Sequence, residues 1–388
     1  LGEKTKMKIF LSLLSWISLI FGVWCLICTL SNLLFFRRHR SKATKINIDG
    51  KRKVSVIIPA RNEEEHLPRL LDSLLNQDYP NYEVMVIDDR STDSTWSIIQ
   101  SYMAKSDKIK GFKNEGNKKL SPYGKINALL NLIPHANGDI LLCTDADTVH
   151  NPSSISMGVR YMEEGNLDIL SGFPYQGVTT YGGGVVTAAM MFSNVVLPHF
   201  ILNPIQFIPF AIGIGQYVMM RRDSYSQVGG YSAMPQKVCD DIGIIKHFMR
   251  HKKKYGFRNL SKDVSCKMYS DRKSAFRGIE RSLTDLFPPT FIMILLLLIA
   301  VTLLMFISWT PIFAPLFICF NENKLLLMAI SGWILTFIGW ASGSREIGFW
   351  RSVCVSGFLS ITAICAMYVH GMYRKLSGKG FDWKGRKV

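Results

Sequence analysis

Long parts of this 388-residue chain lack charged side chains, although the whole chain carries 46 Lys and Arg against 29 Asp and Glu. Among the runs without Lys, Arg, Asp or Glu are 9–36, 286–321, 325–343 and 352–372. About 20 apolar residues cross a bilayer, and uncharged runs of this length are rare in soluble folds. The runs predict a membrane anchor over 1–40 and a transmembrane region over 286–373, followed by a basic tail over 374–388.

The first run also lacks the marks of a cleaved secretory signal. Its apolar part exceeds the roughly 7–15 residues of such signals, and no small-x-small cleavage site follows it. The basic side chains that follow it instead are Arg37, Arg38, His39, Arg40, Lys42 and Lys45. They outnumber Lys4, Lys6 and Lys8 before the run. Since basic flanks favour the cytoplasmic side, we expect a multi-pass protein of the cell membrane whose polar region, 52–285, is cytoplasmic.

This orientation conflicts with the basic tail. Three further spans after the polar region would carry residues 374–388 to the outer side, where basic flanks are disfavoured. We therefore expect one of the later runs, or the apolar stretch near 185–220, to be re-entrant or interfacial.

The eight cysteines lack the paired spacing of zinc ligands. Cys25 and Cys28 form a C-x-x-C inside the first apolar run, where packing is a better interpretation than redox chemistry. The net charge of +17 would suggest nucleic acid as the partner of a soluble protein. Here the positive charge gathers beside the predicted membrane ends and at 251–254, which favours membrane lipids as partners and excludes nucleic acid.

The polar region predicts an α/β fold. Buried strands are expected at 54–59, 82–87 and 140–143, an amphipathic helix at 63–77, and a second helix after the polar turn 88–93 with Ser or Thr as its cap. Apolar strands that alternate with helices indicate a parallel sheet covered on both faces. Ligands of such sheets bind beyond the carboxyl ends of the strands.

Paired carboxylates stand at two of these strand ends. Asp145 and Asp147 flank Ala146 directly after the third strand, and such an oxygen-rich turn suits Mg²⁺ or Mn²⁺ shared with substrate phosphates. Asp88 and Asp89 end the second strand, where a carboxylate can bind a base or ribose. The alternatives are a solvated turn for the first pair and a helix cap for the second.

A third pair, Asp240 and Asp241, precedes the helical pattern at 242–250. Transfer of a group to a hydroxyl needs a base beside the acceptor, and Asp241 is the candidate. The alternative is a helix cap, because a carboxylate is favourable at a helix N-terminus.

Several motifs in order resemble the family 2 glycosyltransferases with the GT-A fold. They are Pro-Ala-Arg-Asn-Glu-Glu at 59–64, Val-Ile-Asp-Asp-Arg-Ser-Thr-Asp at 86–93, Gly-Lys-Ile-Asn-Ala-Leu at 124–129, Asp-Ala-Asp at 145–147, Arg-Arg-Asp-Ser-Tyr at 221–225, Val-Gly-Gly-Tyr at 228–231 and Asp-Asp at 240–241. The resemblance covers about 52–260 and implies inverting transfer of a sugar from a nucleoside diphosphate. A GT-A domain over 52–285 is therefore expected.

The same resemblance assigns roles to individual residues. Ala60, Glu63 and Asp89 are expected to bind the nucleotide, Lys125 and Asp145 the rest of the donor, and Asp147 with Asp145 the divalent metal, Mg²⁺ or Mn²⁺. Asp241, beside Asp240, is expected to be catalytic, and Gly229 and Gly230 to shape the acceptor side.

The chain departs from the family pattern at three places. The turn has Arg90 where the family has Gly, and Asp240 stands where the family often has Glu. The stretch 276–282 has neither the Gln nor the Trp of the Gln-x-x-Arg-Trp motif of processive members. This absence argues against polymer synthesis.

For the acceptor, Met268-Tyr269 and the tail 382–386 resemble family members that glucosylate a carotenoid acid in staphyloxanthin-type pigment synthesis. This implies UDP-glucose as the donor and a lipophilic carboxylate as the acceptor, which Arg277 and Arg281 would hold. Transfer to a polyprenyl phosphate or another lipid of envelope polysaccharide or glycolipid synthesis is the alternative, and the basic run 252–254 would suit a phosphate. A catalytically dead scaffold is disfavoured because every key carboxylate is present.

Overall fold

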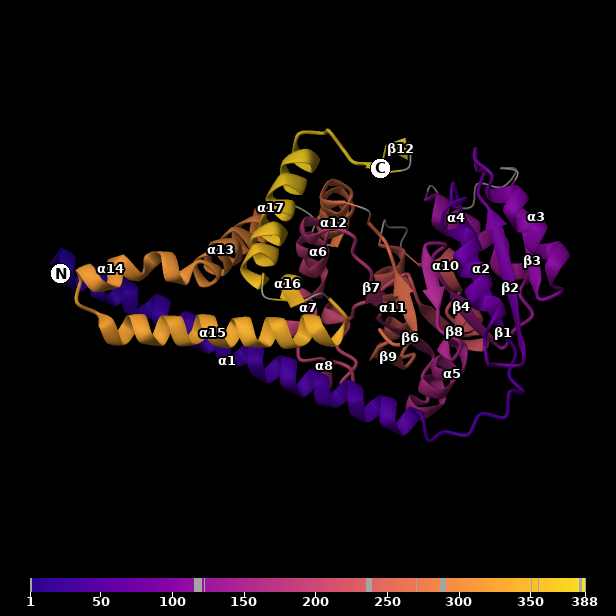
Figure 1. Ribbon diagram of the computed structural model, residues 1–388, viewed down its shortest axis with the longest axis horizontal. Helices are drawn as coiled ribbons and strands as arrows, with labels where there is room; N and C mark the ends of the chain where they lie inside the picture. The colour runs from indigo at the N-terminus through magenta and orange to yellow at the C-terminus, as the bar shows by residue number, and fades with distance from the viewer. Residues whose placement is uncertain are drawn as a thin grey trace. The chain divides into compact units, whose positions relative to one another are not determined.

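The computed structural model describes residues 2–114, 121, 123–234, 239–269, 271–286, 291–349, 351–354, 356–383 and 386–387. The chain forms two compact units (Figure 1). The helical unit comprises Leu1–Leu34, Val178–His199 and Tyr269–Val388, and the sheet unit comprises Phe35–Gly177 and Phe200–Met268. Residues 269–285, which we expected within the catalytic domain, belong to the helical unit.

The sheet unit is built on a seven-stranded sheet with the order β3-β2-β1-β4-β8-β6-β9. Its strands are β1 (Val54–Ala60), β2 (Tyr82–Asp88), β3 (Ile109–Lys113), β4 (Ile140–Cys143), β6 (Ile169–Phe173), β8 (Val218–Arg221) and β9 (Tyr255–Asn259). The predicted strands β1, β2 and β4 are parallel, and β3, which was not predicted, extends this parallel part beside β2. The sheet is mixed as a whole, because β8 runs antiparallel to both β4 and β6.

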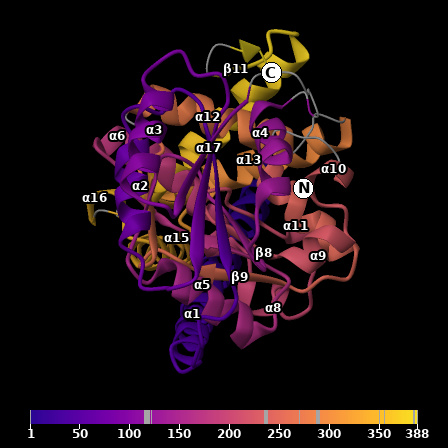
Figure 2. The ribbon, with the colours of Figure 1, turned by 90° about the vertical axis from the view of Figure 1, so that its right-hand side faces the viewer.

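Helices cover both faces of this sheet, as the apolar strands predict. Val56, Ile57 and Ile58 of β1 point alternately to opposite faces and all are fully buried. Helices α2 (Leu67–Leu75), α3 (Thr95–Lys105) and α5 (Ser154–Gly165) share one buried cluster with Val56 and Ile58, while α4 (Gly124–Leu132) contacts β1 and β2 outside that cluster (Figure 2).

Two helix starts differ from the sequence expectation. The helix expected at 63–77 begins at Leu67, because Pro68 fits a first helical turn and the backbone N–H of Glu63 instead donates to Thr95 Oγ1 at 2.8 Å. The N-cap residue of α3 is Ser94, which makes no side-chain cap hydrogen bond. The Asp93 carboxylate accepts from the Thr95 backbone N–H at 3.0 Å instead.

The sheet unit contains a second sheet and several further helices. A three-stranded sheet has the order β5-β10-β7. Its strands are β5 (Thr148–His150), β7 (Tyr175–Gln176) and β10 (Val264–Cys266), and the further helices are η1 (Ile133–His135), η3 (Ile208–Phe210), α9 (Arg222–Gln227), α10 (Gly230–Ala233) and α11 (Asp240–Arg250).

The C-terminal end of the first helix, α1 (Glu3–Ala43), also belongs to the sheet unit. The Arg40 guanidinium donates two hydrogen bonds to the buried Asp263 carboxylate, at 2.6 and 3.0 Å. His39 Nδ1 lies 2.8 Å from Glu164 Oε2, and Glu164 also pairs with Arg258 at 3.3 Å. His39 and Arg40, two of the basic residues that we assigned to the membrane flank, therefore form ion pairs that join α1 to the rest of the sheet unit.

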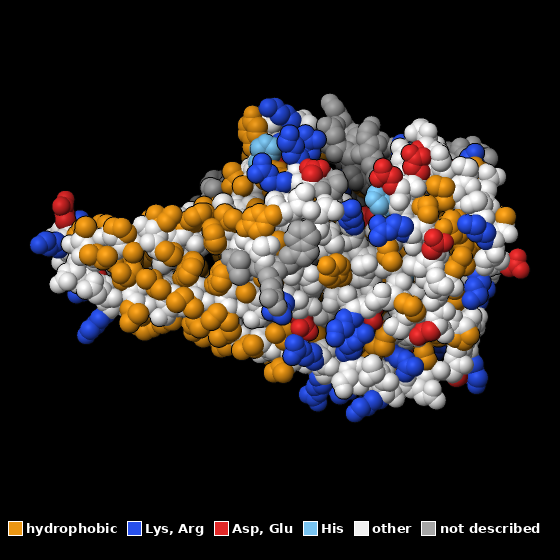
Figure 3. Space-filling model, in the orientation of Figure 1, with side chains coloured by type: hydrophobic (Ala, Val, Ile, Leu, Met, Phe, Trp, Pro, Cys, Tyr) orange, Lys and Arg blue, Asp and Glu red, His pale blue; other side chains and the backbone are white. Residues whose placement is uncertain are grey.

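The helical unit contains the long apolar helices. Its elements are α1, α6 (Tyr181–Ala188), η2 (Ala189–Met191), α7 (Phe192–Val196), α8 (His199–Leu202, which ends in the sheet unit), α12 (Arg272–Leu286), α13 (Phe291–Ser308), η4 (Thr310–Phe313), α14 (Ala314–Cys319), α15 (Asn323–Glu346), α16 (Arg351–Cys354), α17 (Gly357–Leu376), β11 (Asp382–Trp383) and β12 (Arg386–Lys387). Apolar side chains cover α1, α14 and α15 in the space-filling view (Figure 3).

Within the described residues, two helices are long and apolar enough to cross a membrane, α1 and α15. A third crossing results if Ile299–Ser308 and Thr310–Cys319, which are bent by 78° relative to each other, count as one broken span. The expected run 352–372 forms α17, which is not among these candidates. The stretch 179–220 is broken into short helices, as its Gly and Pro content indicates.

Small residues allow α1 and α15 to pack closely. The hydroxyls of Ser15 and Ser18 donate to the carbonyls of Leu325 and Ala329, each at 2.9 Å. One turn further, a Cβ on Gly22 would lie 2.2 Å from the Gly332 carbonyl oxygen. Such small-residue contacts are typical of helices that associate in membranes. Since both residue numbers rise together, the two helices run parallel.

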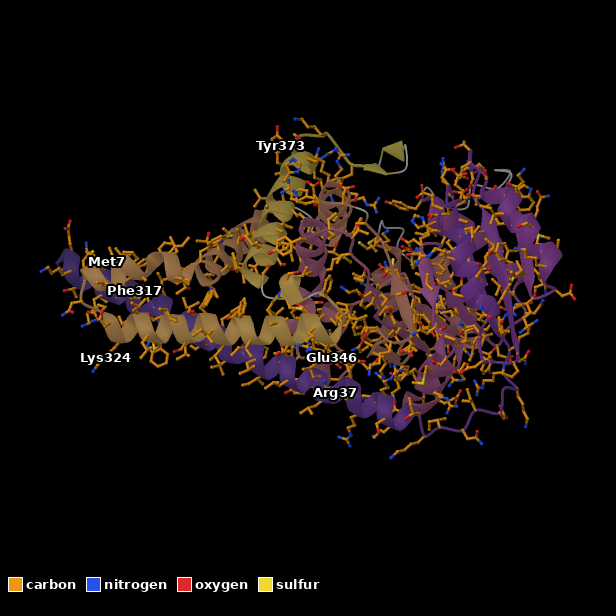
Figure 4. The ribbon with its side chains drawn as sticks, viewed as in Figure 1. Met7, Arg37, Phe317, Lys324, Glu346 and Tyr373 are labelled. Carbon is orange, nitrogen blue, oxygen red and sulfur yellow. The ribbon has the colours of Figure 1, made fainter. Side chains whose placement is uncertain are left out.

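The starts of these two helices meet. Met7 packs in a cluster with Phe317 of α14, and Lys8 forms an ion pair of 2.9 Å with Glu322, directly before α15 (Figure 4). The turn between α14 and α15 therefore lies beside the start of α1 within the helical unit.

Candidate active site

Lys125 stands at the centre of a carboxylate cluster in the sheet unit. It is the second residue of α4, and its Nζ lies 2.7 Å from Asp145 Oδ1 and 3.5 Å from Asp240 Oδ2. Burial would lower the pKa of Lys125, but the charges of Asp145, Asp240 and Asp241 raise it well above the usual value. The ammonium group is therefore held in its charged form. The sequence motifs at 124–129, 145–147 and 240–241 meet at this single cation.

Asp241 is fixed by the backbone of two elements. Its Oδ2 accepts from the Gly215 N–H at 2.9 Å, and its Oδ1 accepts from the Ile242 N–H at 2.8 Å. The second bond joins adjacent residues and is not a helix cap, because the N-cap residue of α11 is Cys239, although Asp241 does lie in the first turn, where a carboxylate is favourable. The first bond joins Asp241 to the loop that precedes β8, at Gly215.

The protonation of Asp241 is poised near neutrality. Burial and the like charge of Asp240 raise the pKa of Asp241 to about 7, although Lys125 and the two backbone N–H groups oppose the shift. Burial also raises the pKa of Asp240. A carboxyl group with a pKa near the working pH is the type of group that can accept a proton during transfer to a hydroxyl.

Asp147 lies in a second carboxylate group, with Asp145 and Glu63. Burial, and then the charges of Asp145 and Glu63, raise the pKa of Asp147 to about 6. Its buried Oδ1 has no hydrogen-bond partner among the described residues. A buried, unsatisfied carboxylate oxygen is costly, and a cation at this point would remove the cost. The fit supports the predicted metal role of the Asp145-Ala146-Asp147 turn, which follows β4.

The residues predicted to bind the nucleotide lie at the ends of β1 and β2. The Ala60 carbonyl accepts from the Asp89 N–H at 2.8 Å, so the two strand ends are directly joined. The Asp89 carboxylate accepts from Asn114 Nδ2 at 2.9 Å and lies 3.9 Å from Arg61 Nη1. Asp88 is buried, and its Oδ1 accepts from the Ser91 N–H at 3.0 Å, a contact within the turn after β2 and not the helix cap considered for it, because the N-cap residue of α3 is Ser94.

The turn after β2 has a left-handed backbone conformation at Arg90, the position where the family pattern has Gly. Arg90 has φ 58°, in the left-handed region that glycine adopts without steric cost. Asn62 of the neighbouring turn has φ 53°, and its side-chain oxygen accepts from the Thr92 N–H at 2.8 Å. Paired turns of this kind hold the strand ends in place even though Arg replaces Gly at position 90.

Gly229 and Gly230 both require glycine. Their φ angles are 74° and 52°, and a Cβ on Gly230 would lie 2.1 Å from the Tyr225 ring. The close approach lets Tyr225 OH accept from the Tyr231 N–H at 3.2 Å. Tyr231 in turn lines a cleft with Lys125, Asp240 and Asp241. The glycine loop therefore shapes the wall of the carboxylate cluster.

A separate cavity of about 180 Å³ lies beside Asp147. It is lined by His66, Arg69, Asp147, Thr148, Val149, Tyr175, Gly177, Ser265, Cys266 and Lys267. The three basic side chains beside a carboxylate make it a polar space that adjoins the candidate metal position.

Sequence reasoning missed several residues of the site. The thiol of Cys266 hydrogen-bonds to Asp147 and is itself contacted by Gln216 Nε2 at 3.0 Å. Gly215 must be small, because a Cβ there would lie 2.8 Å from Lys125 Nζ. Asn114 contacts Asp89. The only sequence signal for Gly215 is the Gly-Ile-Gly triplet before β8, and we see none for Asn114 or Cys266.

Arg277 and Arg281, which we expected on the acceptor side, lie on α12 of the helical unit. Arg277 is exposed, and Arg281 is partly buried.

Comparison with known proteins identifies relatives for this arrangement. Residues 55–229 match the family described as Glycosyl transferase family 2. The chain is 29% identical over 227 residues to the Bacillus subtilis (strain 168) protein EpsE, whose name describes it as a glycosyltransferase, over 58% of this chain and 75% of that protein. It is 33% identical over 145 residues to 4,4'-diaponeurosporenoate glycosyltransferase of Staphylococcus aureus (strain bovine RF122 / ET3-1), which is 37% of each chain.

One solved structure shares the fold over nearly the whole chain. The mannosyltransferase PcManGT from Pyrobaculum calidifontis, in complex with GDP-Man and Mn²⁺, superposes with a TM-score of 0.51 and covers 94% of this chain and 99% of its own. At 17% identity, the likeness concerns the fold alone.

Proposed function

We propose that the protein is a family 2 glycosyltransferase, a membrane-bound inverting enzyme that moves a hexose from a nucleotide-sugar to a lipophilic acceptor, because residues 55–229 match that family. The observation that carries the proposal is the cluster around Lys125, in which a carboxyl group with a pKa of about 7 stands beside a second carboxylate and a fixed cation. UDP-glucose is the first donor to test.

The chemistry follows from the charges in the cluster. The acceptor oxygen forms a bond to the anomeric carbon of the sugar, and the bond between that carbon and the diphosphate breaks. The nucleoside diphosphate leaves with the electron pair. If the acceptor is a hydroxyl, its proton passes to Asp241, whereas a carboxylate acceptor has no proton to lose at neutral pH. Lys125 would stabilise the negative charge that grows on the leaving group.

A divalent metal fits the residues beside this cluster. Asp147 offers a buried oxygen without a partner, and Asp145 and Glu63 add negative charge nearby. The described residues contain no group of three or more His, Cys, Asp or Glu that could hold a metal by themselves. Mg²⁺ and Mn²⁺ can bind through one or two carboxylates together with substrate phosphates. Such an ion neutralises charge on a diphosphate leaving group.

The acceptor is proposed to be lipophilic, with a carotenoid acid as the first candidate. The long apolar helices support an acceptor that reaches the enzyme from a bilayer, and the similarity to a carotenoid-acid glycosyltransferase supports a carboxylate. Arg277, exposed on α12, offers a guanidinium that could bind a carboxylate in two-point fashion. A polyprenyl phosphate or another lipid is the competing acceptor.

The decisive experiment incubates membranes that contain the full chain with labelled UDP-glucose, Mn²⁺ and separate acceptors. The acceptors are a carotenoid acid, diacylglycerol and a polyprenyl phosphate, and products are identified by mass spectrometry. We expect a glucosyl ester of the carotenoid acid. Product on the polyprenyl phosphate alone would replace the proposed acceptor, and no transfer from several nucleotide-sugars would contradict the proposed function.

Asp241→Asn separates the two kinds of acceptor. We expect a loss of roughly 100-fold or more in kcat/KM with a hydroxyl acceptor, where the base is needed, and a much smaller loss with a carboxylate. Because an Asn amide would face the Gly215 or Ile242 N–H group, Asp241→Asn also disturbs the loop. The ratio between the two acceptors therefore matters, and equal losses on both would show that Asp241 holds structure only.

A further inference from the structure

Exposed apolar side chains of the sheet unit gather in one short segment. Ile201, Ile205, Phe207 and Phe210 are 45%, 60%, 42% and 50% exposed. Among the described residues of this unit, the only other large apolar side chain in this class is Met103, at 40%. Four of five such side chains therefore lie within residues 200–210, which we call the 200–210 segment.

Polar side chains of the segment bind it to the sheet. Gln206 Nε2 donates to the Tyr255 carbonyl and Gln206 Oε1 accepts from the Tyr255 N–H, both at 2.8 Å. Asn203 Oδ1 accepts from the Phe257 N–H at 2.8 Å. These bonds satisfy backbone groups of β9, which is an edge strand of the sheet. The segment thus turns its polar side inward and its apolar side outward, the reverse of an ordinary surface loop.

Basic side chains adjoin the segment. Lys246 Nζ donates to the Pro209 carbonyl at 3.2 Å. The lysine cluster (Lys252, Lys253 and Lys254) immediately precedes Tyr255, to which Gln206 is bound. Lys252 and Lys254 are exposed. Apolar side chains beside lysines are the composition of surfaces that lie in a bilayer interface and contact anionic headgroups.

The end of the anchor helix lies on the same strand. The rings of Phe36 and Phe257 are 6.4 Å apart, and the Arg258 guanidinium lies 5.8 Å from the Phe35 ring. Phe257 therefore contacts α1 through its ring and the 200–210 segment through its backbone. Leu34, the residue before Phe35, is 68% exposed, and the uncharged run ends two residues later, at Phe36. At 1.5 Å per helical residue, this part of the sheet unit lies at the membrane boundary if α1 crosses the membrane.

We propose that the 200–210 segment and the lysine cluster form a docking surface of the catalytic unit for the surface of a bilayer that contains anionic phospholipid. The apolar side chains enter the interface, and Lys252 and Lys254 contact the headgroups. The catalytic unit is thereby held against the membrane by a contact separate from α1. The inference uses the membrane anchor of the proposed function but none of its transfer chemistry.

The test places a photo-cross-linking residue in the full chain, reconstituted in nanodiscs of phosphatidylcholine with or without phosphatidylglycerol. The variants are Phe207→p-benzoylphenylalanine and Phe210→p-benzoylphenylalanine. Met103→p-benzoylphenylalanine is the matched control, since it is similarly exposed in the same unit but lies on α3. We expect lipid adducts at 207 and 210, at least tenfold above those at 103. Adducts within the same chain or to a second copy, or no adducts, would overturn the docking surface.

Substitution of the lysines tests whether the contact depends on charge. In the variant that carries the cross-linking residue at position 207, the double substitution Lys252→Gln and Lys254→Gln should weaken the contact with lipid about 30-fold in the anionic nanodiscs. Each lysine near an anionic surface strengthens such a contact about fivefold. The neutral nanodiscs should show little change. Lys105→Gln with Lys108→Gln, elsewhere in the same unit, is the control pair. Equal effects of both pairs, or an effect independent of phosphatidylglycerol, would contradict headgroup binding. Whether the full chain is recovered in nanodiscs tests membrane insertion of the anchor separately. Neither this recovery nor the cross-linking requires transfer activity.

Discussion

The carboxyl group of Asp241 sets the pH dependence that we expect of the transfer. Burial and the charge of Asp240 raise its pKa to about 7, above the usual range of an aspartate. A general base works only when deprotonated, so kcat/KM with a hydroxyl acceptor should rise with pH through about 7 and level off above it.

Two neighbouring substitutions should move this midpoint in opposite directions. Asp240→Asn removes the like charge, which lowers the pKa of Asp241 and moves the midpoint to lower pH. Lys125→Met removes the opposing cation, which moves the midpoint to higher pH and also lowers the rate. Profiles of kcat/KM for both variants across neutral pH measure the shifts. Movement of both midpoints in the same direction would mean that another group titrates.

At the residue scale, the sequence predicted the carboxylates of the site but few of their partners. Asp89, Asp145 and Asp147 could be found because each lies within four residues of the end of a buried strand, and parallel strands have their carboxyl ends at one edge of the sheet. Cys266 and Asn114 could not, because each reaches its carboxylate through a tertiary contact with an element that carries no motif. Gly215 is favoured because Lys125 Nζ would lie 2.8 Å from a Cβ at this position, and this tertiary contact leaves no signal in the sequence.

At the scale of elements, the end of α1 is joined to the catalytic unit by an ion pair whose loss should be costly. Arg40→Ala leaves the fully buried Asp263 carboxylate without its bidentate partner. Removal of one partner of a buried pair costs about 3–5 kcal/mol, and we expect about 2–4 kcal/mol here because Arg40 is partly exposed.

Unfolding of the full chain in detergent by urea measures this loss. Arg38→Ala is the control, because Arg38 is exposed and belongs to the same basic group. It should leave the free energy of unfolding within about 0.5 kcal/mol of the parent. Equal stability of the two variants would show that the Arg40–Asp263 pair does not hold α1 to the sheet unit.

This ion pair also shows why it was incomplete to interpret all the basic residues after the first apolar run as a membrane flank. In the sequence, His39 and Arg40 are indistinguishable from the other basic residues that follow the anchor. Their partners Glu164 and Asp263 stand 125 and 223 residues away, beyond the reach of any local pattern. The strands β1, β2 and β4 were predictable for the opposite reason, since a short run of buried apolar residues between turns is a local signal.

At the scale of the whole molecule, the parallel packing of α1 and α15 constrains the membrane topology. If the catalytic unit is cytoplasmic, α1 starts on the outer side, and α15 starts there too because Ser15 and Gly22 of α1 face Leu325 and Gly332. The chain must then cross outward once before Asn323, for which the bent pair 299–319 is the candidate. If α17 does not cross, the basic residues 374–387 remain cytoplasmic, and the conflict found in the sequence disappears.

We therefore predict three crossings, with the turn between α14 and α15 outside and the residues after α17 inside. Cys319 is the exposed cysteine at the end of α14 and lies directly before that turn. A membrane-impermeant thiol reagent should label it in intact cells, with Cys319→Ser as the control for the other cysteines. A fluorescent protein fused after residue 388 should fluoresce, as it does only in the cytoplasm. A dark fusion together with labelled Cys319 would mean that α17 is a fourth crossing. Labelling of Cys319 only after permeabilisation would mean that α15 starts in the cytoplasm. Because α15 packs parallel to α1, α1 would then start there too.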